Sequence, residues 1–166
     1  MSGVLELDEE GCLNLLNTII VNRLGDAVDI ELFHDEDRVK ELVAEAHNYN
    51  VVVIMSNHDF EKVPAKYVIE FRLKKMAALG ADVPKLACMP HNAKDVLTLL
   101  SATNEVNEAI DNPLITMAMG DIGKVTRIAG QVFGSSLSFG AVGKTSAPGQ
   151  LSINDLRNAE NYLEIK

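Results

Sequence analysis

Residues 51–89 read VVVIMSNHDFEKVPAKYVIEFRLKKMAALGADVPKLACM, and this stretch determines the fold class. Its two ends, Val51–Ser56 and Lys85–Met89, are short runs that are mostly apolar on both faces, as in strands buried beneath helices. Between them, Ala65–Leu79 carries apolar residues three or four apart, which is the period of an amphipathic helix, and Gly80 follows as a C-cap. The stretch therefore predicts one strand–helix–strand unit of a parallel sheet.

The same alternation continues on both sides of this unit. Further strands are expected at Ala27–Phe33, Leu114–Met119 and Leu137–Val142. Further helices are expected at Glu9–Leu24, Asp35–Asn48, Ala93–Asp111, Gly123–Phe133 and Ile153–Tyr162. A helix followed by about five parallel β/α units predicts an α/β fold, either an open doubly wound sheet or an incomplete (β/α)8 (TIM) barrel. The first strand is not followed by a glycine-rich fingerprint, which weakens the dinucleotide-binding version, and the lack of a linker predicts a single domain over residues 1–166.

Composition narrows the range of partners. The formal net charge of −9 argues against nucleic acid or an anionic membrane surface as the main partner, so an anionic ligand would need a local cluster of cations. Cys12 and Cys88 are the only cysteines and lack the spacing of a disulfide framework or a zinc site. The sequence has neither a membrane-length apolar run nor a signal-peptide layout, and we expect a cytoplasmic protein.

Lys85 is the first candidate for chemistry, because it stands at the start of an apolar strand run. Strand alternation places Lys85, Ala87 and Met89 on one face, and Leu86 and Cys88 on the other. A lysine kept away from water inside a barrel retains some neutral amine, which can add to a ketone and form an iminium. The alternative is a lysine at a strand end that extends into solvent.

His58 is the second candidate, because Ser56, Asn57, His58 and Asp59 interrupt a purely hydrophobic strand at its end. Histidine is the side chain best suited to proton transfer near neutral pH. One alternative is that His58 is a hydrogen-bonded structural histidine and Asp59 caps a helix. Another is that the two residues form part of a metal site, although His58 and Asp59 alone are too few ligands for zinc.

A candidate anion site lies in the last two units. Arg127 is expected in the first turns of a helix that opens at Gly123, and Ser146 and Gln150 lie in the loop TSAPGQ. Helix starts and loops after the last barrel strands bind anions, and arginine matches a carboxylate in bidentate fashion. The alternative for Arg127 is a surface ion pair. Together the candidates place an amine, a base and an anion clamp at the ends of successive strands.

Several segments together resemble the type I 3-dehydroquinate dehydratases. The similarity runs from about Glu9 to near the C-terminus, and SNHDF with SAPGQ is its most specific part. The segments that follow in the family's order are DIELF, VVVIMSNHDF, RLKKMAALGADVPKLACMP, KDVLTLL, ITMAMG, RIAGQVFGSSLSFGAV and SAPGQLSINDLR.

The resemblance implies a Schiff-base lyase of the shikimate pathway that converts 3-dehydroquinate to 3-dehydroshikimate by syn loss of water, without metal or organic cofactor. Lys85 would form the Schiff base with the C3 ketone. His58 would remove the C2 proton and help protonate the departing C1 hydroxyl. Arg127, Ser146 and Gln150 would hold the substrate carboxylate and the groups next to it. The apolar lining would comprise Met117, Met119, Phe60 and Phe139.

Family members are barrels of eight units, and the resemblance covers the last five. The acidic and arginine residues that bind substrate hydroxyls, and the glutamate that orients the histidine, are expected to have no counterpart; nothing assigns Glu6 or Asp8 that role. Open barrel edges predict self-association, as a homodimer. The alternatives are a working dehydratase completed by a neighbour, a non-catalytic remnant that self-associates, and another class I aldolase-type enzyme that reuses Lys85.

Overall fold

A four-stranded parallel sheet covered by helices forms the body of the protein, whose computed structural model describes residues 7–163. The strands are β1 (Ala27–Glu31), β2 (Val52–Asp59), β3 (Val83–Cys88) and β4 (Ile115–Ala118). The helices are α1 (Glu9–Val21), α2 (Glu36–Asn48), α3 (Lys66–Ala78), α4 (Ala93–Asn107), α5 (Gly120–Ala129), the 3-10 helix η1 (Gly130–Phe133) and α6 (Ile153–Tyr162). Within residues 7–163, no helix is long and apolar enough to cross a membrane.

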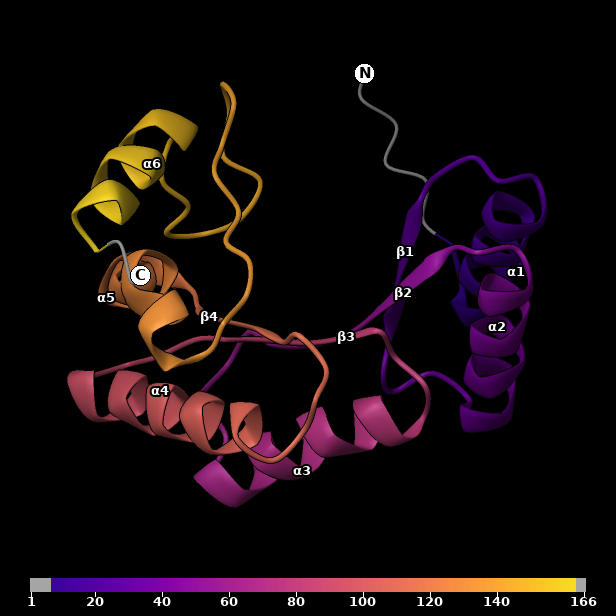
Figure 1. Cartoon of the computed structure of the whole chain (residues 1–166), viewed down its shortest axis with the longest axis horizontal. Coiled ribbons are helices and arrows are strands. Elements are labelled where there is room, and N and C mark those ends of the chain that lie inside the picture. Colours follow the sequence, from indigo (N-terminus) through magenta and orange to yellow (C-terminus); the bar gives the residue numbers. More distant parts are fainter. Residues whose placement is uncertain (1–6, 164–166) are drawn as a thin grey trace.

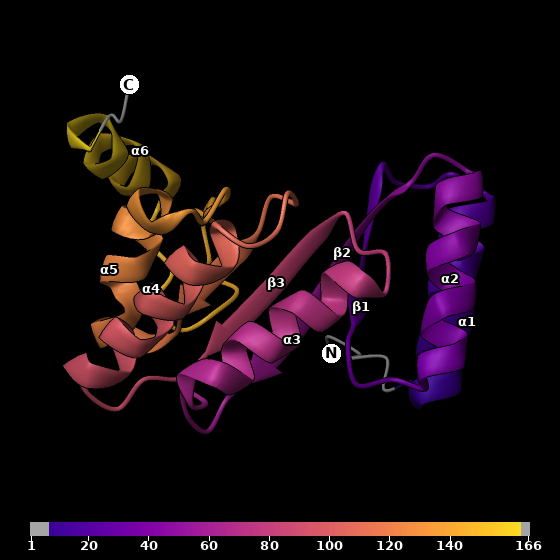
Figure 2. The same cartoon turned by 60° about the horizontal axis from the view of Figure 1, so that its bottom comes forward.

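The order of the strands distinguishes between the two expected architectures. The sheet runs β1-β2-β3-β4, and each strand pairs in parallel with the next one along the chain. A doubly wound sheet reverses its strand order at a switch point, whereas a barrel adds its strands in sequence. The helices lie outside an arc of strands that is open on one side (Figures 1 and 2). The α/β class and the barrel-type arrangement are therefore confirmed.

The expected fifth strand at Leu137–Val142 is wrong. The chain begins to pair beside β4 through a single bridge between Leu114 and Ser135 and then turns away. Ala141 bridges instead to Ser152, at the start of α6. Of the apolar residues in this segment, Ala141 is buried beside the start of α6, Phe139 lines the inner face near Lys85, and Val142 is 86% exposed. The segment therefore does not extend the sheet, and hydrophobicity alone does not distinguish the two arrangements.

The two faces of the sheet bury different sets of side chains. The face under the helices carries the main core, in which Val53, Met55 and Leu86 are fully buried. The inner face carries a separate small cluster of Ala87, Ile115 and Met117. Strand alternation explains the division, because neighbours along one strand point to opposite faces. The predicted separation of Ala87 from Leu86 is confirmed.

Candidate active site

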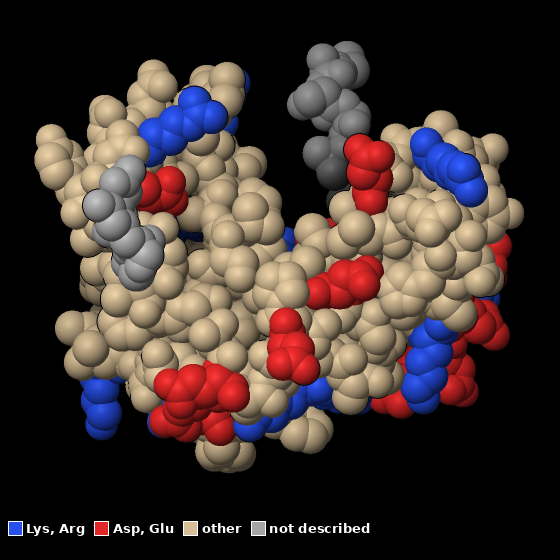
Figure 3. Space-filling model, viewed as in Figure 1, with Lys and Arg blue, Asp and Glu red and all other residues tan. Residues whose placement is uncertain are grey.

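A cavity of about 160 Å³ opens on the inner face of the sheet. It is lined by His58, Lys85, Ala87, Met117, Met119, Arg127, Phe139, Ser146, Ala147 and Gln150. All predicted site residues except Phe60 are among them. Phe60 is 64% exposed and lies beside the cavity, where its ring stacks on that of His58 with centroids 6.0 Å apart. The molecular surface is hollowed on the side between α5–α6 and α1–α2 (Figure 3).

Strand register brings His58 and Lys85 to the same face. Lys85 pairs with Ser56 across the β2–β3 ladder, and His58 pairs with Ala87. Residues two apart on a strand share a face, so the imidazole lies one step beyond the amine on the neighbouring strand. Met117 pairs with Ala87 from β4 and completes the floor. Because β2 extends to Asp59, His58 lies within the strand rather than after it.

The side chain of Lys85 is held inside the cavity rather than extended into solvent. It is 12% exposed, and its Nζ lies 2.6 Å from Oδ2 of Asp29 on β1. The same Nζ lies 5.6 Å from the centroid of the Phe139 ring. The amine is therefore largely shielded from water and forms an ion pair with Asp29 across the inner face of the sheet.

A carboxylate missed at the sequence level contacts His58. Nδ1 of the ring lies 2.9 Å from Oε2 of Glu31, the last residue of β1. The sequence alone assigned no carboxylate to this histidine, whereas the structure places Glu31 in contact with it. Asp8 is occupied elsewhere, as the N-cap of α1, and Glu6 lies outside the described residues. The available signal was DIELF, which places Asp29 and Glu31 two residues apart, and hence on one face, in an otherwise apolar strand.

Arg127 is a buried cation. It is 3% exposed and lies in the last turn of α5, because this helix spans Gly120–Ala129 rather than Gly123–Phe133 as predicted. Burial lowers the pKa of its guanidinium. None of the salt bridges among residues 7–163 involves Arg127. The alternative of a surface ion pair is thus wrong.

The guanidinium of Arg127 keeps unused hydrogen-bonding capacity. It makes two long contacts, from NH1 to Sδ of Met117 at 3.5 Å and from NH2 to the carbonyl oxygen of Pro148 at 3.4 Å. Its Nε has no hydrogen-bond partner within the described part of the chain. Because a buried charge is costly unless it is paired, these donors suit an anionic ligand.

The loop that carries Ser146 and Gln150 is fixed on the start of α5. The backbone N–H and the hydroxyl of Ser146 both donate to Oε1 of Gln150, at 2.7 and 3.2 Å. Gly149 has a φ of +73°, and a Cβ there would lie 2.1 Å from the carbonyl oxygen of Gly120. The N–H of Gly120 donates to the carbonyl oxygen of Pro148 at 3.2 Å. Glycine is therefore required for this close approach, which holds the loop beside Arg127.

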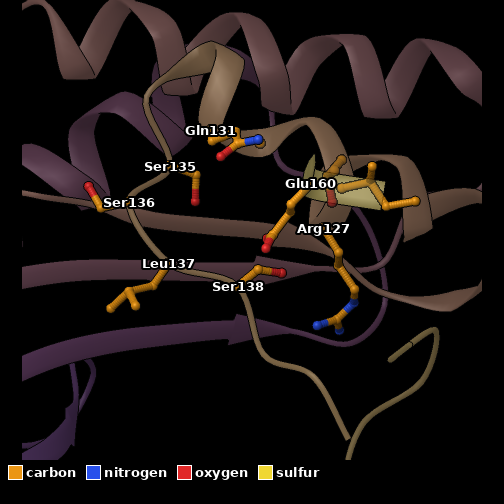
Figure 4. A pocket seen from close by; sticks show the side chains of 10 residues that line it. Arg127, Gln131, Ser135, Ser136, Leu137, Ser138 and Glu160 are labelled. Atoms are coloured by element: carbon orange, nitrogen blue, oxygen red, sulfur yellow. The ribbon is translucent and has the colours of Figure 1, made fainter. Parts of the chain in front are cut away.

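A second cavity of about 50 Å³ lies on the other side of Arg127. Its lining includes Ser135, Ser138 and Glu160, and the Arg127 guanidinium lies at the end away from Gln131 (Figure 4). This space is large enough for water but too small for a ring-sized substrate. Across residues 7–163, no group of three or more His, Cys, Asp or Glu side chains is arranged to hold a metal ion.

The type I 3-dehydroquinase family model matches residues 2–166 of the chain. The 3-dehydroquinate dehydratase of Lactiplantibacillus plantarum is 52% identical over 163 residues, which is 98% of this chain and 65% of that protein. The 3-dehydroquinate dehydratase of Escherichia coli O1:K1 is 51% identical over 162 residues, or 97% of this chain and 64% of that protein. The chain thus spans just under two thirds of the length of these relatives.

Solved structures give the same result for the fold. The type I 3-dehydroquinate dehydratase of Clostridium difficile superposes with a TM-score of 0.91 at 45% identity, covering 98% of this chain and 64% of that one. The 3-dehydroquinate dehydratase of Geobacillus kaustophilus gives a TM-score of 0.93 at 35% identity, covering 97% and 62%. The four parallel strands and their helices match part of the TIM barrel of these enzymes. The chain belongs to the type I 3-dehydroquinase family.

Proposed function

We propose that this chain acts on 3-dehydroquinate as a carbon–oxygen lyase of the shikimate pathway, forming a Schiff base and releasing 3-dehydroshikimate. One observation supports this most directly: a single cavity contains an amine, an imidazole and a buried guanidinium with unused donors. A cyclic keto acid such as 3-dehydroquinate has a carboxylate for the guanidinium and a ketone for the amine. The family relationship supports the same substrate.

The carboxylate of the substrate would be held at Arg127. Its free donors lie in the same cavity as Ser146 and Gln150, which belong to the loop packed against α5. An anion bound there neutralises a charge that is buried without a carboxylate partner among residues 7–163. The apolar side chains of Met117 and Met119 line the wall beside it, next to the ring carbons.

Lys85 would carry out the covalent step. Its ammonium must first lose a proton, and the nearest acceptor is Oδ2 of Asp29 at 2.6 Å. The neutral amine then adds to the C3 carbonyl carbon, and the resulting carbinolamine loses water to form an iminium. The positively charged iminium nitrogen attracts electrons from the adjacent C2–H bond, so no other electron sink is needed for its cleavage.

His58 would move the protons that follow. Its ring takes the C2 proton, and the C–H electron pair forms an enamine with the iminium. The enamine then expels the C1 hydroxyl, which leaves as water with a proton supplied by the protonated His58. Hydrolysis of the conjugated iminium frees the product and restores the Lys85 amine. Because His58 both removes the C2 proton and protonates the C1 hydroxyl, the two groups leave from the same side of the substrate ring, which is syn elimination.

Trapping with borohydride tests this proposal. We expect incubation with 3-dehydroquinate and borohydride to add mass irreversibly to the peptide that contains Lys85, and substrate without borohydride to yield 3-dehydroshikimate. Lys85→Met should abolish the adduct, whereas Lys124→Met, which removes a partly exposed lysine paired with Asp121, should not. An adduct without turnover would mean that the amine works but the dehydration does not. No adduct would refute the proposal.

We further propose that the chain self-associates as a homodimer through its open sheet edges. The described sheet ends at β1 and β4, and its strands form an open arc rather than a closed barrel. Unpaired backbone groups at a sheet edge favour pairing with a second chain. Size-exclusion chromatography with light scattering over a range of concentrations tests this. A monomer at every concentration would contradict it, whereas a dimer that forms no adduct with dehydroquinate would indicate a non-catalytic form.

A further inference from the structure

We propose that Glu31 is a positioning residue that fixes the tautomer of His58. In this inference the carboxylate holds the proton on Nδ1 and leaves Nε2 bare to accept a proton from substrate. The catalytic part rests on the proposed function, but the tautomer itself does not. No sequence motif pairs a carboxylate with this histidine, so the role rests on the contact seen in the structure.

The contact between the two residues is direct. Nδ1 of His58 lies 2.9 Å from Oε2 of Glu31, a normal distance for a charge-assisted hydrogen bond. Glu31 pairs with Ser56 in the β1–β2 ladder, so His58 lies two residues further along the neighbouring strand, on the same face. The two side chains are 32% and 31% exposed, so the contact is neither fully solvated nor fully buried.

The ring of His58 is oriented by more than this hydrogen bond. Phe60 stacks against it with an interplanar angle of 13°. Stacking limits tilting of the imidazole, and the bond to Glu31 limits its rotation about the side chain. With Nδ1 directed at the carboxylate, Nε2 is the ring nitrogen left for the cavity that His58 lines together with Lys85.

The second oxygen of Glu31 is also engaged, which holds the carboxylate in place. Oε1 accepts from Nδ2 of Asn57 at 3.0 Å, and Asn57 is 4% exposed. Oδ1 of Asn57 in turn accepts from NH1 of Arg72 at 2.8 Å. Arg72 itself lies over the ring of Phe33, 5.3 Å from its centroid. A buried amide anchored by a guanidinium therefore supports the carboxylate from behind, and a carboxylate held in this way keeps a histidine oriented.

Charge strengthens the argument from geometry. When His58 takes a proton it becomes an imidazolium, and a carboxylate in contact stabilises this charge. The other charged groups near the pair are Arg72 and Asp59 on one side, 3.9 Å apart, and the Lys85–Asp29 ion pair on the inner face. In each of these two pairs the carboxylate is already matched by a cation. Glu31 is therefore the carboxylate that can balance a positive charge on the His58 ring.

Nitrogen-15 NMR of the imidazole tests the tautomer without any need for activity. In the full chain, we expect neutral His58 to carry its proton on Nδ1, whereas free histidine favours Nε2. Glu31→Ala should shift the ring towards the Nε2–H form. Glu9→Ala is the matched control, because it removes a carboxylate 3.3 Å from Nδ1 of a different histidine, His34. The control should leave the His58 signals unchanged.

The result that overturns the inference is an Nε2–H tautomer of His58 in the unmodified chain, a measurement that needs no variant to fold. An unchanged tautomer in Glu31→Ala would overturn it as well. For catalysis, Glu31→Ala should still form the borohydride adduct at Lys85 while kcat falls by about 10²- to 10⁴-fold and KM changes little. If the unmodified chain forms no adduct, the proposed function fails, and the NMR result still decides the role of Glu31.

Discussion

Replacing Arg127 by methionine removes a buried cation, and the structure predicts opposite effects on stability and on ligand binding. The side chain is 3% exposed, and the two hydrogen bonds that it makes within residues 7–163, at 3.5 and 3.4 Å, are long. Apolar replacement of buried ionic groups is often neutral or stabilising, by about 1–4 kcal/mol. Since Arg127 has few contacts to lose, we expect the free energy of unfolding of Arg127→Met to be unchanged or slightly raised in urea denaturation followed by circular dichroism.

Binding of a carboxylate ligand is expected to weaken strongly in the same variant. A hydrogen bond to a charged group contributes about 1.5–3 kcal/mol to binding. Because each 1.4 kcal/mol changes Kd by about tenfold, the loss of one such bond weakens binding by roughly 10- to 150-fold. Calorimetry with quinate measures this without covalent chemistry, because quinate carries a C3 hydroxyl in place of the ketone. Its methyl ester should bind less tightly than quinate to the unmodified chain but about equally to Arg127→Met.

The control for this experiment is Arg157→Met, which removes an exposed arginine on α6 and should change neither stability nor affinity. The reasoning is refuted if Arg127→Met loses more than about 2 kcal/mol of stability while binding quinate as before. That result would mean that the guanidinium is a structural group whose cost of burial is met within the protein, and that the carboxylate binds elsewhere.

Two further predictions concern groups outside the cavity. Burial raises the pKa of the Cys88 thiol to about 12. Iodoacetamide at pH 8 should therefore label the half-buried Cys12 and should label Cys88 only after unfolding. Equal labelling of the two cysteines in mass mapping of the folded protein would contradict this prediction. Hydrogen bonds from Lys40 and Lys75 lower the pKa of Glu36 to about 2, so their stabilising effect is present above the ordinary value of 4.5 and is lost as pH falls towards 2. Glu36→Gln should therefore lower the urea midpoint at pH 7 but not at pH 2, and an equal difference at both would be inconsistent with this linkage.

The fold class was predictable because the local sequence pattern of β2 and β3 is sufficient to identify them as buried strands. Each is a short apolar run bounded by polar residues and joined by a helix of clear period, and these features do not depend on distant contacts. The failure at Leu137–Val142 has a different origin. An apolar run there is compatible with a strand, and equally with an irregular segment that lines the cavity through Phe139 and bridges to Ser152 through Ala141.

The candidate site was predictable where a polar residue interrupts an apolar run. Lys85 and His58 are conspicuous for that reason, and register alone brings them together. Asp29 and Glu31 were missed because an acidic residue near a strand end is ordinary in sequence. Their contacts with Lys85 and His58 join residues 56 and 27 positions apart, and such contacts depend on which strands become neighbours. The burial of Arg127 likewise depends on how β4 and the loop of Pro148 lie against α5.

The position of β1 links closure of the sheet to the chemistry of the cavity. The cavity is lined from β2, β3, β4, α5 and the loop of Ser146, whereas Asp29 and Glu31 approach it from β1, the strand with the open edge. These two carboxylates are 41% and 32% exposed. Any chain that pairs with β1 would exclude water from them and strengthen their contacts with Lys85 and His58, because charges interact more strongly in a medium of lower dielectric constant. If the chain dimerises and acts on 3-dehydroquinate as proposed, pairing at this edge would be coupled to acid–base chemistry inside the cavity. Dimer formation would then change the rate of dehydration more than the affinity for the carboxylate at Arg127.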